Sequence, residues 1–300
     1  MYDATEAIIL LFLHFYFKQA TEFLQMYRIV NKESFSENVV KLDIEAPRIA
    51  RRRRAGHFVI VRTGEKGERI PLTIAEADPE KGTITLVIQK VGVTSHKVAS
   101  LDKGDSLRDV VGPLGQATHI EKVGTVLCAG GGVGIAPLLP IVEAMKKAGN
   151  RVITVLAART RELIILEEHI RKYSDETIIM TDDGSYGKKG LVTQGMEGVI
   201  RTTKIDQAIA IGPAIMMKYA SQLTKKYNIP TMASLNSIMV DGTGMCGACR
   251  VSVGGKTRFV CVDGPEFDAH EVDFDELLSR LGAYKEEEAA AYQKYLKELS

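Results

Sequence analysis

The residues with the clearest chemistry lie near the C-terminus: Asp241, Cys246, Cys249 and Cys261. With a cysteine in place of the aspartate, their spacing would be the C-x4-C-x2-C…C pattern of a plant-type [2Fe–2S] cluster. Intervening glycines allow the loop to fold tightly, with its N–H groups turned toward sulfur. A carboxylate can ligate iron, although it is a harder ligand than thiolate. The motif therefore predicts single-electron chemistry at a cluster held by one aspartate and three cysteines.

The cysteines also allow two other interpretations, a zinc site and structural thiols. Cys246 and Cys249 have the C-x2-C spacing of zinc sites, but no second such pair exists and His270 is the one imidazole nearby in the sequence. Four cysteines in 300 residues, without a secretory signal, fit a reducing cytoplasm better than a disulfide framework. Cys128 lies in an apolar stretch far upstream and is expected to pack as a core residue. We favour the cluster over zinc and over structural thiols.

A glycine-rich loop, Gly130-Gly-Gly-Val-Gly134, joins a predicted buried strand to a predicted helix. Successive glycines let a backbone approach a phosphate or ribose, and a helix start favours anions. Many such loops are only tight turns, but this one follows the first strand of a predicted parallel sheet. Arg159 and Arg161, after the next strand, either meet an adenosine phosphate or lie in a solvated loop. The candidate NAD(P) residues are Gly131, Gly132, Gly134, Arg159, Asp182, Asp183, Gly184, Gly212 and Pro213.

A second candidate cofactor site lies upstream, where Glu68-Arg-Ile-Pro-Leu-Thr73 places a cation, a rigid proline and a hydroxyl together. This suits a flavin, with the hydroxyl near the ring and the arginine near a phosphate. A short helix predicted over 95–100 could hold a diphosphate on its first N–H groups. An ordinary turn and a helix cap are the plain alternatives. The candidate FAD residues are Arg69, Pro71, Leu72, Thr73, Ile88, Gln89, Gly92, Thr94 and Ser95.

The elements that must position these residues predict a multidomain β plus α/β protein. From 26 to 118, short strands (39–44, 58–61, 70–74, 84–91 and 106–111) predict an antiparallel flavin-binding β-barrel. From 119 to 233, alternating strands and helices, among them a helix over 163–173, predict a doubly wound parallel sheet. Residues 234–271 form the expected [2Fe–2S] subdomain, with strands at 249–253 and 257–262. Two helices are expected in 272–300, the last lying on its own domain or serving as an interface.

The net charge of +1, from 39 basic and 38 acidic residues, does not suggest nucleic-acid binding. The run Arg51 to Arg54 is expected to be a solvated loop, with docking of an acidic partner as the alternative. The apolar stretch Ala7 to Phe17 is too short to span a bilayer, which needs about 20 residues, and it lacks signal-peptide features. We expect no membrane span and interpret residues 1–25 as an N-terminal extension or a start-site artefact; a membrane-surface helix is less favoured.

Six segments together resemble the electron-transfer subunits with a ferredoxin–NADP⁺ reductase-like fold, over about residues 26–283. These segments are Glu68-Arg-Ile-Pro-Leu-Thr-Ile74, Gly130-Gly-Gly-Val-Gly134, Asp182-Asp-Gly-Ser-Tyr-Gly187, Gly212-Pro-Ala-Ile-Met-Met-Lys218, Met239-Val-Asp-Gly-Thr-Gly-Met-Cys-Gly-Ala-Cys249 and Cys261-Val-Asp-Gly-Pro-Glu-Phe-Asp-Ala-His270. The family includes dihydroorotate dehydrogenase electron-transfer subunits, which look like four-cysteine proteins. It also includes small subunits of electron-bifurcating NADH-dependent reduced ferredoxin:NADP⁺ oxidoreductases, which carry one aspartate and three cysteines, as here. One departure is that Ile70, and not arginine, stands three residues before the flavin hydroxyl.

The resemblance implies the cofactors FAD, a [2Fe–2S] cluster and NAD(H), with NADP(H) not excluded. It also implies a partner, a large glutamate-synthase-like flavoprotein subunit with FAD and [4Fe–4S] clusters, through which ferredoxin exchanges electrons. The chain would then be the NAD(H) branch of a cytoplasmic heterodimer. The alternatives are an electron-transfer subunit of a dihydroorotate dehydrogenase or sulfhydrogenase and, from another class, a non-redox nucleotide-binding module with a zinc site.

Overall fold

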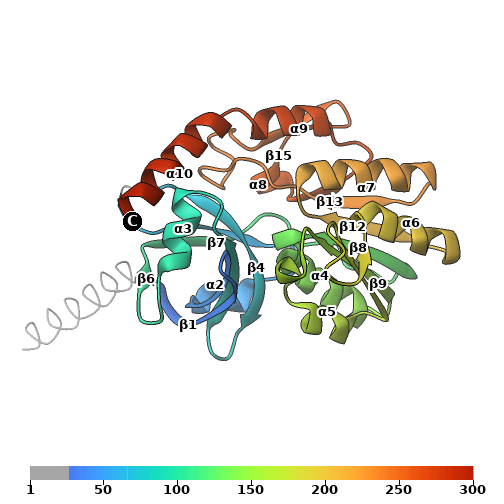
Figure 1. Ribbon diagram of the computed structural model, residues 1–300, viewed down its shortest axis with the longest axis horizontal. Coiled ribbons are helices and arrows are strands. Elements are labelled where there is room, and N and C mark those ends of the chain that lie inside the picture. Colours follow the sequence, from blue (N-terminus) through green and yellow to red (C-terminus); the bar gives the residue numbers. More distant parts are fainter. Residues whose placement is uncertain (1–26, 66, 300) are drawn as a thin grey trace, which may run out of the picture.

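The computed structural model describes residues 27–65 and 67–299. The extension predicted over residues 1–25 lies outside this range. Figure 1 shows an antiparallel sheet in blue and cyan beside a second sheet in green to orange, with the last two helices running over both. In the described part of the chain, every helix is too short or too polar to cross a lipid bilayer.

The N-terminal sheet is a near-barrel of seven antiparallel strands. Its edge strands β6 and β7 are separated in the chain by Arg108 alone, so the sheet curls back almost onto itself. Alternate residues such as Ile29, Leu42 and Leu86 fill its core with no exposed surface. The strands, in spatial order, are β6 (Ser106–Leu107), β1 (Tyr27–Ser36), β2 (Val39–Glu45), β5 (Thr83–Gln89), β4 (Ile70–Asp78), β3 (Phe58–Arg62) and β7 (Asp109–Leu114).

Two helices accompany this sheet, and one of them was not predicted. Helix α3 (Val93–Ser100) agrees with the expected short helix, whereas α2 (Pro47–Arg52) covers half of the arginine run. Its first residue is proline, which is tolerated there because that position needs no N–H. The prediction of a solvated loop is wrong for Arg53, whose guanidinium donates to the carbonyl oxygens of Ile74 (3.0 Å) and Ala75 (2.8 Å).

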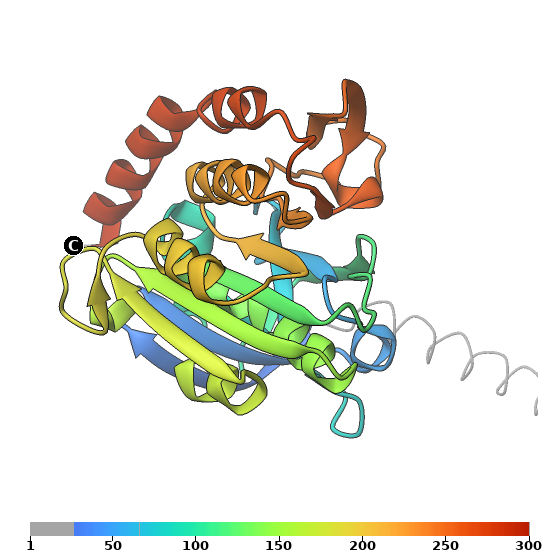
Figure 2. The ribbon, with the colours of Figure 1, turned by 90° about the vertical axis from the view of Figure 1, so that its right-hand side faces the viewer.

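The second sheet is parallel except at one edge, where β16 runs antiparallel to β13. Helices α4 (Ile135–Lys147) and α5 (Glu167–Tyr173) cover one face, and α6 (Val192–Thr202) and α7 (Ala214–Lys226) cover the other (Figure 2). This is the predicted doubly wound architecture. The strands, in spatial order, are β11 (Lys188–Lys189), β10 (Glu176–Thr181), β9 (Arg151–Ala158), β8 (Thr125–Gly131), β12 (Gln207–Ile211), β13 (Thr231–Ser234) and β16 (Glu266–Asp268).

The strand order places a topological switch point between β8 and β12, because the chain winds outward from β8 to one side and from β12 to the other. Ligands of such sheets bind at the carboxyl ends of these two strands. The short helix η1 (Gly132–Gly134) follows β8 there. The helix predicted over 163–173 is shorter than expected: η2 (Arg161–Leu163) is separate, and Leu166, with φ of 54°, precedes the start of α5 at Glu167.

The C-terminal part forms a hairpin, β14 (Arg250–Val253) and β15 (Lys256–Phe259), and then the one-turn helix α8 (Val260–Asp263). The strand predicted to reach residue 262 therefore ends at Phe259, whose N–H donates to the Asp263 carboxylate as the chain turns. Cys261 lies in this helical turn, with its N–H 3.4 Å from Cys249 Sγ. Cys128, by contrast, is a fully buried core residue of β8, as predicted.

Helices α9 (Phe274–Leu281) and α10 (Lys285–Leu299) end the described chain. Helix α10 does not lie on the subdomain that precedes it but reaches α3 of the barrel (Figure 1). His96 Nδ1 is 3.2 Å from the Tyr292 hydroxyl, and the Tyr295 ring meets the His96 ring edge-on at 5.5 Å. The last helix therefore makes a contact within the chain, between its C-terminal helices and the barrel.

Candidate functional site

Asp241 begins the predicted cluster loop, and its carboxylate is held by the loop itself. Oδ2 accepts hydrogen bonds from Thr243 Oγ1 (2.6 Å), Thr243 N (3.0 Å) and Met245 N (3.2 Å). These donors stabilise the anion and keep the pKa of Asp241 below its usual value, with the Thr243 hydroxyl as the largest cause and the charge of Arg69 as a smaller one. The carboxylate is therefore ionised and ready to bind a cation.

Cys249 and Cys261 form a close pair, with their sulfur atoms 3.2 Å apart. Both are buried and neither is in a disulfide. Burial, together with the neighbouring Cys249 thiol, raises the pKa of Cys261 to about 12. Cys246 is exposed on the loop that carries Cys249, and it makes the smallest of the contributions that raise the pKa of Cys261.

The structure thus brings two of the four predicted ligands into contact. Within residues 27–65 and 67–299, no three His, Cys, Asp or Glu side chains converge into a ready-made metal centre. The donor set nevertheless suits iron. It consists of the adjacent free thiols of Cys249 and Cys261, the thiol of Cys246 on the loop that carries Cys249, and the ionised carboxylate of Asp241. A zinc site at these cysteines would lack a histidine ligand, because His270 Nε2 contacts Thr224 Oγ1 at 3.1 Å in a separate polar network.

The cluster loop packs directly on the barrel. A Cβ at Gly242 would lie 2.8 Å from Ile60 Cγ1 and 2.8 Å from Leu114 Cδ1, so only glycine allows this approach, and its φ of 82° adds the same requirement. Gln116 ties the two parts further, because its N–H donates to Gly264 O (2.6 Å) and its side chain to Val262 O (2.8 Å). The cluster loop is therefore fixed beside strands β3 and β7.

The candidate FAD strand is the neighbour of β3. Pro71, Leu72 and Thr73 pair with residues 60, 59 and 58 of β3 and are half-buried. They therefore lie one strand away from the cluster loop. Ile88 is fully buried in the barrel core, so only its backbone is free to face a cofactor, whereas Gln89 is half-buried at the end of β5.

The start of α3 already uses its hydroxyl groups. Thr94 donates to Glu68 Oε2 at 2.6 Å, and Ser95 Oγ accepts from the N–H groups of Val91 and Gly92, both at 3.0 Å. Ser95 thus acts as a helix cap, which was the plain alternative for this segment. The group that remains to hold a diphosphate is the backbone, because the first N–H groups of a helix have no partner within it.

The glycine loops after β8 and β12 touch at the switch point. A Cβ at Gly134 would lie 2.7 Å from both Gly212 Cα and Ile211 O, and a Cβ at Gly131 would collide with Met216 Sδ. Gly132, with φ of 55°, faces open space. The structure therefore brings buried Gly131 and Gly134 together with Gly212 at the switch point, with half-buried Gly132 and exposed Pro213 beside them.

The loops after β9 and β10 are joined to each other at the same edge of the sheet. Asp183 N donates to Arg159 O (3.2 Å), and Arg161 N donates to Ser185 Oγ (2.9 Å). Asp183 accepts from the hydroxyl and N–H of Ser185, which lower its pKa. Arg159, Asp182, Asp183 and Gly184 are therefore brought together and exposed, farther from the switch point than the glycine loops.

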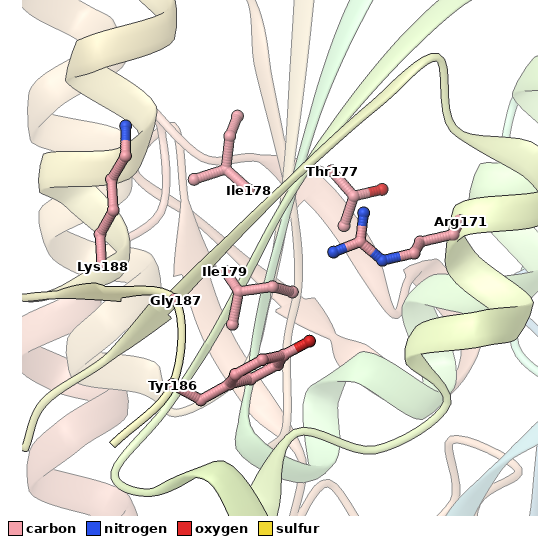
Figure 3. A pocket seen from close by; sticks show the side chains of 7 residues that line it. All are labelled: Arg171, Thr177, Ile178, Ile179, Tyr186, Gly187 and Lys188. Carbon is pink, nitrogen blue, oxygen red and sulfur yellow. The ribbon is translucent and has the colours of Figure 1, made fainter. Parts of the chain in front are cut away.

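An open depression of about 290 Å³ lies along the outer side of β10 (Figure 3). The Arg171 guanidinium that lines it donates to Glu167 Oε1 at 2.7 Å, and the Tyr186 hydroxyl donates to the same oxygen at 3.0 Å. None of the predicted NAD(P) residues lines it. Arg171 is therefore already paired with a carboxylate, while Lys188, which also lines the depression, is exposed.

Three side chains near the predicted sites were not anticipated. Thr243 could have been found from the Asp-x-Thr pattern, which is typical of an Asx turn. Met216, packed between the two glycine loops, gives no sequence signal of its own. Ser237, in the segment that leads to the cluster loop, is buried and its hydroxyl has no partner within the described residues.

Comparisons with known proteins agree with this geometry. Residues 236–273 match the family model described as the iron–sulfur cluster binding domain of dihydroorotate dehydrogenase B, and residues 129–222 match an oxidoreductase NAD-binding domain. The chain is 49% identical to a Thermotoga maritima protein named as a homologue of the dihydroorotate dehydrogenase B (NAD⁺) electron-transfer subunit, covering 90% of this chain and 95% of the relative. It is 38% identical to a probable subunit of that kind from Methanocaldococcus jannaschii, covering 66% of this chain and 74% of the relative. A solved structure from a study of flavin-based electron bifurcation in NADH-dependent reduced ferredoxin-NADP oxidoreductase superposes with a TM-score of 0.87 at 47% identity, covering 91% of this chain and 98% of that chain.

Proposed function

The chain belongs to the family of dihydroorotate dehydrogenase B electron-transfer subunits and their homologues, and from this premise we propose that it transfers electrons as a subunit of a flavin-based electron-bifurcating NADH/ferredoxin:NADP⁺ oxidoreductase. Its route would connect NAD(H), FAD and a [2Fe–2S] cluster. The observation that carries the proposal is the close packing of Gly242 against Ile60 and Leu114, because this contact fixes the cluster loop against the barrel.

Within this route, each part of the chain has a holding role. The loops after β8 and β12, which carry Gly132 and Pro213 at their surface, would receive the nicotinamide nucleotide, and strand β4 with the start of α3 would hold FAD. FAD, when bound, accepts a hydride and passes electrons on singly, which joins two-electron to one-electron chemistry. The thiols of Cys246, Cys249 and Cys261 with the Asp241 carboxylate would hold the cluster.

We propose that a larger subunit docks over the cluster loop. Two large apolar side chains are exposed on and next to this loop: Met245 (88% exposed), which precedes the exposed Cys246, and Val240 (52% exposed), which precedes Asp241. Aliphatic side chains exposed to this degree are typical of a contact site when they cluster. The partner is proposed to be the glutamate-synthase-like flavoprotein with FAD and [4Fe–4S] clusters, through which ferredoxin reacts. The only cysteine outside the cluster motif, Cys128, is buried and cannot hold further clusters.

Asp241 favours the bifurcating enzyme over a dihydroorotate dehydrogenase, because the resemblance assigns one aspartate and three cysteines to the former. The names of several relatives favour the second function, electron transfer for dihydroorotate dehydrogenase B. Co-purification of the chain with its partner, followed by iron, sulfide and flavin analysis, separates the two. The proposal predicts NADH-dependent reactions coupled to ferredoxin and NADP⁺ in the complex only. Ferredoxin reduction by NADPH with this chain alone would overturn it.

A further inference from the structure

The Asp241 carboxylate uses its two oxygens unequally. Three donors converge on Oδ2, and two of them belong to Thr243: the hydroxyl at 2.6 Å and the N–H at 3.0 Å. The Met245 N–H completes the set at 3.2 Å. None of these hydrogen bonds reaches Oδ1. One oxygen is therefore occupied by the protein and the other is available.

The position of Thr243 is fixed by the glycines on either side of it. Gly242, with φ of 82°, is pressed against Ile60 and Leu114, as described above. Gly244, with φ of 87°, would place a Cβ 3.2 Å from both methyl groups of Val262. Because both neighbours are anchored, the backbone of Thr243 is held beside Asp241, and its hydroxyl lies 2.6 Å from Oδ2.

We propose that Thr243 positions Asp241 as a one-oxygen ligand of the cluster, by holding Oδ2 so that Oδ1 alone is offered to iron. This inference rests on the proposed function. Carboxylates bind metals through one or both oxygens, and hydrogen bonds to a ligating group orient it and tune the metal. A donor on Oδ2 withdraws electron density from the ligand. Loss of this donor should stabilise the oxidised cluster and shift its midpoint potential to more negative values.

The test compares Thr243→Val, which keeps the shape and removes the hydroxyl, with Thr243→Ser, which keeps the hydroxyl. Each full-length protein is reconstituted anaerobically with FAD, iron and sulfide. The reduced cluster is examined by electron paramagnetic resonance, and its midpoint potential is measured by redox titration. We expect a changed spectrum and a more negative potential for Thr243→Val, and wild-type values for Thr243→Ser. A matched control is Thr257→Val, an exposed threonine of the β15 hairpin away from Asp241, which should match wild type.

A second comparison covers the case in which Thr243→Val does not assemble a cluster. In the Asp241→Cys background, the hydroxyl no longer has a carboxylate oxygen to hold, so adding Thr243→Val should move the potential less than it does when Asp241 is present. A cluster in the double variant, but not in Thr243→Val, would therefore support the inference. An equal shift in both backgrounds would overturn it, as would a wild-type spectrum and potential in Thr243→Val. A wild-type protein that binds no iron would instead contradict the proposed function.

Discussion

The Thr118 hydroxyl donates a hydrogen bond of 2.8 Å to Glu266 Oε1, and this contact joins the linker after the barrel to the edge strand β16 of the parallel sheet. The same oxygen would lie 3.2 Å from a Cβ at Gly56, so the carboxyl group sits where three segments meet. Burial there raises the pKa of Glu266 to about 7, which the Thr118 bond only partly offsets. An acid that the mechanism does not use therefore titrates near neutral pH.

We expect Glu266→Gln to remove a pH-dependent destabilisation. An unfolded glutamate titrates near 4.3, so the folded protein binds this proton more tightly, and the free energy of unfolding falls as pH rises from about 4.5 to 7. The variant should therefore gain stability relative to wild type between pH 5 and pH 8, by up to about 3 kcal/mol. Urea unfolding at both pH values measures this difference. Glu37→Gln, at an exposed position, is the control, and identical pH dependence in Glu266→Gln and wild type would contradict the assignment.

Gly134→Ala should disrupt the contact between the glycine loops after β8 and β12. The new Cβ meets backbone atoms of Gly212 and Ile211 that cannot rotate away, so we expect a loss of about 1–3 kcal/mol in unfolding free energy together with weaker NADH binding. Urea unfolding and a fluorescence titration with NADH measure the two effects. Gly198→Ala is the matched control, because that glycine lies within helix α6 with nothing near its Cβ position, and it should gain up to about 1 kcal/mol. NADH binding unchanged in Gly134→Ala would exclude a role for this loop.

Asp241→Cys should retain a cluster, since the substitution restores the four-cysteine spacing. The replacement of a hard oxygen by a thiolate changes the ligand field and should move the midpoint potential. Iron content and a redox titration of the reconstituted protein provide the measurement. A potential equal to that of wild type would show that the aspartate has no tuning role.

Tyr295→Ala should loosen helix α10 from the barrel. Tyr295 meets the His96 ring and lies 5.3 Å from Lys97 Nζ, and such aromatic and cation–π contacts contribute about 1 kcal/mol each. Hydrogen exchange of the amides in α10 and α3 should become faster in this variant. Tyr284→Ala, at a tyrosine that is 60% exposed, should leave exchange in α3 as in wild type. Equal exchange in Tyr295→Ala and wild type would mean that the two helices are held by other contacts.

Local sequence patterns predicted much of the fold, because strand and helix periodicity and glycine-rich turns act over a few residues. Strands β2 and β3, predicted over 39–44 and 58–61, each extend one residue farther than predicted, and most other elements differ by a few residues at their ends. The three-residue strand β16 was not predicted, because it is defined only by its pairing with β13, some 30 residues earlier in the chain. The prediction that Cys261 lies in a strand is wrong for a related reason. In the helical turn α8, the N–H groups of Val260 and Cys261 face Cys249, which lies 12 residues before Cys261, and local sequence patterns do not show this contact.

Sequence motifs identified the segments that carry the candidate sites, but they did not show which side chains in those segments face a cofactor. Ile88 and Gln89 are consecutive in a strand, so their side chains point to opposite faces, and the structure buries the first in the core. The assignment of both as FAD residues stays a prediction, and for Ile88 it requires the backbone. The spacing of Asp241 and Thr243 suggests an Asx turn. The structure is needed to show that both the N–H and the hydroxyl of Thr243 donate to Oδ2 of Asp241.

Helix α10, the last element of the described chain, rests on α3, one of the earliest. During synthesis on the ribosome the barrel emerges well before this helix exists, and domains generally fold as units in that order. The surface of α3 around His96 must therefore stay open to water until residues 285–299 have been synthesised.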